Sequence, residues 1–135
     1  MKYIFLITWI VIIFISTCTH STKELLQDGN VYFTFIPSPN FLAFISFTPN
    51  HVNLPEFFGH TIMFFLLTYL FIKVNKDLLA SVFTAIAIGI STEMLQPFFS
   101  RTADVVDLAA DMLGISIFII LYLINGRFSM ITNEN

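Results

Sequence analysis

The segment that decides the fold is RTADVVDLAADMLGISIFIILYLI, residues 101–124. Its second half is almost wholly apolar, as expected of a helix that enters a lipid bilayer. The same helix nevertheless opens with Asp104, Asp107 and Asp111, spaced three and four residues apart. At about 100° per residue these aspartates fall within a narrow arc of one helix face. Acids within a membrane span normally face the interior of a helix bundle or a water-filled cavity, which is therefore the expected environment of this face.

The composition is that of a membrane protein. Of the 135 residues, 56% are hydrophobic and only 11% are charged, whereas soluble domains carry about 25% charged residues. The lipid bilayer is therefore the first partner that the sequence implies. Six basic residues spread along the chain make no nucleic-acid-binding patch. One cysteine, Cys18, excludes an intrachain disulfide and offers no metal-ligand pattern.

Four apolar segments predict an all-α transmembrane bundle of four helices. The expected spans are residues 3–17, 55–74, 78–99 and 103–124, in a single domain of residues 1–135. A hydrocarbon core of about 30 Å needs roughly 20 helical residues, which the last three segments supply. The first segment is short for a span unless its flanks contribute.

The first segment has two interpretations. Lys2 followed by an apolar run and small residues resembles a signal peptide, and "ISTC" resembles a lipoprotein cleavage box that ends at Cys18. Three clear spans follow it, however, and an uncleaved anchor needs no further processing. We expect the segment to be retained as the first helix.

Basic residues predict the orientation of the bundle. Cytoplasmic loops carry an excess of lysine and arginine, and four crossings put four basic residues on one side and two on the other. Both termini are therefore expected in the cytoplasm, with the first loop and the loop around Arg101 outside. The first group is Lys2, Lys73, Lys76 and Arg127, and the second is Lys23 and Arg101.

The first external loop, residues 30–54, is aromatic-rich, nearly uncharged and interrupted by Pro37, Pro39 and Pro49. It is too broken for a fifth span. Such a segment suits either the outer membrane interface or a cap over the mouth of the bundle, and the sequence does not separate these two positions.

Ionisable residues of the spans gather toward the outer ends of three helices, which predicts a polar pocket open to the outside. Spacings of three and four residues put the members of each helix on one face. Rows of small residues at every fourth position in the last two spans favour close helix packing around the pocket. The pocket residues expected are Glu56, His60, Glu93, Gln96, Arg101, Asp107 and Asp111.

Five carboxylates with one histidine and one arginine cannot all stay ionised and close together. We expect Arg101 to form a fork-like pair with Asp104 or Asp107, and Asp104 to cap the last helix. A cluster that simply joins three helix ends is the structural alternative. We expect no cofactor and no metal, although one histidine with several oxygens would suit Mn²⁺, Mg²⁺ or Ca²⁺ better than zinc.

Two stretches, "LPEFFGHTIMFFLLTYL" and "STEMLQPFFSRTADVVDLAADMLG", resemble the VanZ-like family of small bacterial membrane proteins. That family shows an acid four residues before a histidine, then a Glu-x-x-Gln turn, then an Arg-to-Asp stretch that runs on to Asn and Gly. The resemblance covers roughly residues 54–125, and a serine at the end of the first span also matches. The matching positions are Ser16, Glu56, His60, Glu93, Gln96, Arg101, Asp107 and Gly114.

Three departures from the family pattern stand out. Phe57 replaces the lysine that usually follows the acid, Asp111 replaces an asparagine, and the first loop is long and aromatic. The first two make the pocket more acidic, so its ligand is expected to differ. The family is named after a protein associated with low-level resistance to teicoplanin-type glycopeptides, so the resemblance implies a cell-envelope role.

The function expected is binding of a cell-envelope component or lipid headgroup in the outer pocket, with an effect on teicoplanin susceptibility. The alternative is a membrane-embedded enzyme that acts on a lipid-linked or cell-wall headgroup, with Glu56 and His60 as an acid–base pair. Enzyme activity is left open. The binding function is favoured because no serine or cysteine nucleophile accompanies the cluster.

Overall fold

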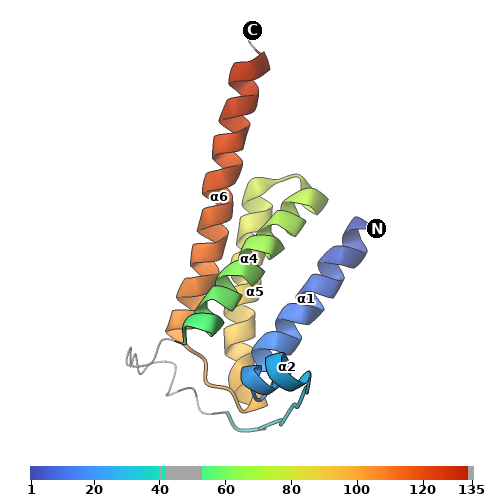
Figure 1. Cartoon of the computed structure of the whole chain (residues 1–135), viewed down its shortest axis with the longest axis vertical. Coiled ribbons are helices and arrows are strands. Elements are labelled where there is room, and N and C mark those ends of the chain that lie inside the picture. The colour runs from blue at the N-terminus through green and yellow to red at the C-terminus, as the bar shows by residue number, and fades with distance from the viewer. Residues whose placement is uncertain (40, 42–52, 134–135) are drawn as a thin grey trace.

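The protein is all-helical in the residues that its computed structural model describes, which are 1–39, 41 and 53–133. The expected fold class is therefore confirmed: four principal helices and no strand in these ranges. The elements are α1 (Lys2–Cys18), α2 (Thr22–Asp28), α4 (Leu54–Asn75), α5 (Leu78–Leu95), the 3₁₀ helix η2 (Gln96–Phe99) and α6 (Val105–Asn133), shown in Figure 1.

Three segments are long and apolar enough to cross a membrane: Leu54–Asn75, Leu78–Phe99 and Val105–Gly126. Each has 22 residues, about 33 Å of helix at 1.5 Å per residue, which matches a hydrocarbon core of about 30 Å. The α1 helix is apolar but shorter, with 17 residues. Many large apolar side chains on the outer faces of these helices are exposed, as expected of surfaces that contact lipid.

The last span differs most from its expected bounds, 103–124, and one short helix was not expected. The α6 helix begins at Val105 and continues to Asn133, beyond the expected end at residue 124. Asn125 and Gly126 follow the apolar run without ending the helix, because a glycine weakens a helix by only about 1 kcal/mol and asparagine by less. The short α2 helix was not predicted. Ser21 caps it by accepting from the Glu24 N–H at 3.2 Å, and Gly29 ends it with a φ of 68°.

The α4 helix is the centre of the bundle. It contacts α1, α5 and α6, and its interface with α6 is the largest in the described structure. Figure 1 shows α1 and α6 on either side of the α4–α5 pair. A tight turn joins α4 to α5, in which Lys76 is left-handed and Asp77 caps α5 by accepting from the Ala80 N–H.

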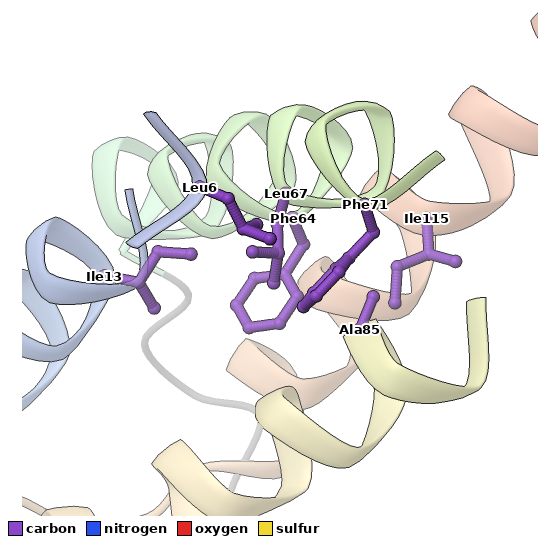
Figure 2. Close-up of a cluster of buried hydrophobic side chains, with 7 residues drawn as sticks. All are labelled: Leu6, Ile13, Phe64, Leu67, Phe71, Ala85 and Ile115. Carbon is purple, nitrogen blue, oxygen red and sulfur yellow. The ribbon is translucent and has the colours of Figure 1, made fainter. Parts of the chain in front are cut away.

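The apolar core joins all four principal helices, as Figure 2 shows. Its buried side chains are Leu6 and Ile13 of α1, Phe64, Leu67 and Phe71 of α4, Ala85 of α5 and Ile115 of α6. The indole Nε1 of Trp9 also donates to the Met63 carbonyl of α4 at 3.0 Å. The α1 helix is therefore held to the bundle by both apolar packing and a hydrogen bond.

Small residues bring the helix backbones together, as their spacing predicted. Ser81, Ala85 and Gly89 are buried along one face of α5, and Ala110 and Gly114 are buried on α6. Gly114 lies directly against the backbone of α4, where a Cβ atom would collide with the Thr61 carbonyl oxygen. This approach sets the separation of α4 and α6.

One end of the bundle, called here the cluster end, carries α2, η2 and the first turns of α4 and α6 (Figure 1). The described part of the first loop covers η2: the Ile36 N–H donates to the Phe98 carbonyl at 2.8 Å, and the Phe33 and Phe35 rings contact Phe99. This part of the loop therefore caps the cluster end. Residues 42–52, on which much of the expected aromatic loop falls, lie outside the described residues.

Candidate functional site

An ion pair between Glu56 and Arg101 lies at the partly exposed rim of the cluster end. The Arg101 Nη2 donates to Glu56 Oε1, and Asn53 Nδ2 donates to Glu56 Oε2 at 3.2 Å. The Arg101 and Glu56 side chains are 16% and 18% exposed. The short chain from η2 holds this arginine in place, because the Arg101 N–H donates to the Gln96 carbonyl at 3.1 Å.

Arg101 pairs with Glu56, whereas a pair with Asp104 or Asp107 was expected. Both aspartates have other contacts. Asp104 Oδ1 accepts from the Val106 N–H at 2.8 Å, and Asp107 faces His60. The contact between Asn53 and Glu56 could have been predicted, since these residues have the Asn-x-x-Glu spacing of a helix start.

Asp104 caps α6, as predicted. Its carboxylate accepts a hydrogen bond from the Val106 N–H, and its side chain is exposed. This geometry satisfies one of the free amides at the start of the helix. Asp104 therefore belongs to the helix terminus, whereas Asp107 and Asp111 point into the bundle.

His60 lies between two aspartates of α6. Its Nδ1 is 2.8 Å from Asp111 Oδ1, and its Nε2 is 3.8 Å from Asp107 Oδ2. His60 is 3% exposed and Asp111 is fully buried. The close α4–α6 contact at Gly114 brings these side chains together, because it is made with Thr61, the residue after His60, and lies about one turn from Asp111.

Glu93 and Gln96 form the third part of the cluster. The Gln96 Nε2 donates to Glu93 Oε1 at 2.5 Å, and the Asp104 N–H donates to Glu93 Oε2 at 3.0 Å. Glu93 is 1% exposed, and Gln96 is fully buried. The carboxylate of Glu93 therefore ties the end of α5 to the start of α6.

The structure brings the expected residues together in two overlapping groups that share His60. The ligand atoms of Glu56, His60 and Asp107 lie within 4.8 Å of one another, and so do those of His60, Glu93 and Asp111. The first group adjoins the rim, and the second, called here the inner group, is entirely buried. Gln96 adjoins the inner group through Glu93, and Arg101 adjoins the first group through Glu56.

Two acceptors near the inner group have no hydrogen-bond partner among the described residues: Asp111 Oδ2 and Gln96 Oε1. Buried polar atoms almost always have a partner, so both need an explanation. The charges of the buried acids also need an explanation. Three buried carboxylates around one imidazole require bound protons, a cation or a ligand that donates hydrogen bonds.

A polar patch at the end of α1 was not predicted, although Ser16 matched the family pattern. Thr17, Cys18 and Thr19 are buried there, and Ser16 is partly buried. The Thr17 hydroxyl donates to the Ile13 carbonyl at 2.9 Å, which satisfies this group within its own helix. The run of small polar residues that closes the first apolar segment was the available signal.

A cavity of about 900 Å³ lies toward the other end of the bundle, between α4 and α6. Its walls include the rings of Phe65, Tyr69, Phe118 and Tyr122, with Lys73 among its lining residues. It is apolar and aromatic, so its chemistry is unlike that of the cluster end.

Comparisons with known proteins agree with these features. The sequence profile of the VanZ/LLP1 family matches residues 2–126. The uncharacterized membrane protein YwnJ of Bacillus subtilis (strain 168) is 34% identical over 131 residues, which cover 94% of each chain. No solved structure matches the chain. The apolar helices and the relative show that this is a multi-pass membrane protein, and the protein belongs to the VanZ/LLP1 family.

Proposed function

We propose that this protein binds a cell-envelope component or lipid headgroup at the cluster end, and that this binding affects susceptibility to teicoplanin-type glycopeptides. The observation that carries the proposal is the gathering of His60, Glu93, Asp107 and Asp111 from three helices beneath a partly exposed ion pair. Ionisable groups inside a membrane are costly and commonly mark functional sites.

The chemistry of the cluster indicates the kind of headgroup. Carboxylates accept hydrogen bonds, so they suit a ligand with hydroxyl or amino donors, such as a sugar or an amine-bearing headgroup. Asp107 is the buried acid that adjoins the rim, since it shares a group with Glu56 and His60. Arg101 supplies positive charge at the rim, where the phosphate of a headgroup would lie.

The proposed orientation places the cluster end outside the cell and both termini in the cytoplasm. Lys2 of α1, Lys73 of α4 and Arg127 of α6 lie in the parts of these helices away from the cluster end, and Lys76 lies in the α4–α5 turn at the same side. An excess of basic residues favours the cytoplasmic side. An outward-facing cluster is then accessible to envelope components.

An enzyme that acts on a lipid-linked or cell-wall headgroup is the second candidate. The observation that favours it is the buried His60, whose Nδ1 lies 2.8 Å from Asp111 Oδ1. A carboxylate at one ring nitrogen orients an imidazole and leaves the other nitrogen to exchange protons. In this arrangement Asp111 replaces the expected Glu56 as the partner of His60, since Glu56 bonds to Arg101 and Asn53.

The test is teicoplanin susceptibility in a susceptible Gram-positive host that expresses the parent protein, His60→Gln or Asp104→Asn. Asp104→Asn is the matched control, because asparagine also caps a helix and Asp104 is exposed outside the buried groups. We expect the parent and the control to raise the inhibitory concentration and His60→Gln to lose the effect at equal membrane abundance.

Two results would count against the proposal. A parent protein that is abundant in the membrane and gives no protection would remove the link to glycopeptides. Loss of protection only in proportion to loss of protein would assign the cluster a purely structural role. A changed lipid or wall component in the parent strain, absent with His60→Gln, would favour the enzyme over the binding protein.

A further inference from the structure

We infer that the inner group, His60, Glu93 and Asp111, holds one divalent cation between α4, α5 and α6. The three side chains offer one imidazole nitrogen and two carboxylates, and their ligand atoms all lie within 4.8 Å of one another. Each side chain is at most 3% exposed. This inference goes beyond the proposed headgroup binding and does not depend on it.

Unpartnered atoms point independently to an occupant. Asp111 is fully buried, and its Oδ2 has no hydrogen-bond partner among the described residues. Gln96 is also fully buried, and its Oε1 has none there either, although its Nε2 donates to Glu93. Both atoms are acceptors at the edge of the inner group. A buried acceptor without a donor is costly, and a metal ion satisfies acceptors as a hydrogen-bond donor does.

The distances suit coordination. Metal–ligand bonds of about 2.1 Å place neighbouring ligand atoms of an octahedral ion about 3 Å apart. His60 Nδ1 and Asp111 Oδ1 are 2.8 Å apart, which fits two ligands of one ion as well as it fits a hydrogen bond. Each carboxylate oxygen has more than one lone pair, so Glu93 can bind an ion while it accepts from Gln96 and Asp104.

The second nitrogen of His60 strengthens the inference. With Nδ1 bound to the ion, the ring proton resides on Nε2, which faces Asp107 Oδ2 at 3.8 Å. A histidine ligand commonly donates its other N–H to a carboxylate, which orients the ring. Asp107 therefore attracts the Nε2–H through its charge, at a distance longer than a hydrogen bond.

Charge and space also favour a cation. Neutral His60 with ionised Glu93 and Asp111 carries a charge of two minus, which one divalent ion balances. Gly89 of α5 leaves room beside Asp111, since a Cβ there would lie only 3.2 Å from Asp111 Oδ2. One imidazole with several oxygens suits Mn²⁺ better than Zn²⁺, which usually binds more nitrogen or sulfur ligands.

The experiment is Mn²⁺ binding to the purified full-length protein in detergent after treatment with a chelator. Free Mn²⁺ is measured by electron paramagnetic resonance during titration, and bound Mn, Mg, Ca and Zn by elemental analysis after gel filtration. We expect one Mn²⁺ per chain, at least tenfold weaker binding for Asp111→Asn, and unchanged binding for Asp104→Asn. The last variant removes one carboxylate outside the inner group and keeps the cap.

Glu93→Gln is the second variant, so that a misfolded Asp111→Asn would not leave the inference without a test. Circular dichroism and gel filtration establish that each variant is folded. A folded parent that binds no ion, or folded Asp111→Asn and Glu93→Gln proteins that bind as the parent does, would overturn the inference. Because no lipid or antibiotic enters this experiment, its failure is distinct from failure of the headgroup proposal.

Discussion

Gly114→Ala should separate the two helices that carry His60 and Asp111. A Cβ at this position would collide with the Thr61 carbonyl oxygen and would lie 3.0 Å from Phe65 N. Both neighbours are backbone atoms of α4, so no side-chain rotation can relieve the collision. The helices must move apart at the largest interface of the bundle.

The size of the effect follows from this movement. A separation of about 1 Å forfeits a quarter to a half of the dispersion attraction at neighbouring contacts. Overpacking costs about 1–3 kcal/mol, and a backbone collision belongs at the upper end. Alanine recovers up to about 1 kcal/mol through its higher helix propensity. We therefore expect Gly114→Ala to lower the free energy of unfolding by about 2 kcal/mol, a factor of about 30 in the unfolding equilibrium.

The assay is unfolding by SDS in mixed micelles, followed by the fluorescence of Trp9. This residue is the single tryptophan of the chain, and its indole bonds to Met63 of α4. The matched control is Gly126→Ala in the same helix, where no described atom lies within 4 Å of the added Cβ. The control should unfold at an equal or higher SDS fraction than the parent. If Gly114→Ala unfolds at the same SDS fraction as the control, the close α4–α6 contact does not exist as described.

Two further predictions concern the rim and the orientation. Glu56→Gln and Arg101→Gln, made singly and together, should show a coupling free energy of about 1 kcal/mol in the same unfolding assay, because both side chains are only partly exposed; strictly additive effects would contradict a stabilising ion pair. In intact cells, an impermeant maleimide should label Asp28→Cys at the cluster end and should label Asn75→Cys only after permeabilisation, with Cys18 unreactive because it is fully buried. Labelling of the two sites in the opposite order would show that the cluster end faces the cytoplasm.

Most of the helices could be predicted because their signals are local. Expected residues 55–74 lie within α4, and expected residues 78–99 coincide with α5 and η2 together. Apolar length and helical period are sufficient to find such segments. The α2 helix also had a local signal, Ser21 and Glu24 before Gly29, but its short polar sequence has no apolar run. The end of α6 was missed because the loss of hydropathy does not by itself end a helix.

The gathering of the candidate residues could be predicted from the sequence, and their individual contacts less so. A spacing of three or four residues requires Asp107 and Asp111 to share a face of α6, and the tight link between spans brings Glu93 to the same end of the bundle. Asp104 could be identified as a cap because capping involves only the next turn. These features depend on residues close together in the chain, so the amino-acid order is enough to establish them.

The partners across helices depend on how each helix is rotated and how closely it packs. Arg101 is 45 residues from Glu56, and His60 is 51 residues from Asp111. Such pairs form or are lost when one helix shifts by an ångström relative to the next. The close contact at Gly114 limits this shift between α4 and α6. Helical period cannot supply these shifts, because they result from packing between segments far apart in the chain. The partner of Arg101, the two neighbours of His60 and the unpartnered Asp111 oxygen were therefore settled by the packing of α4, α5 and α6.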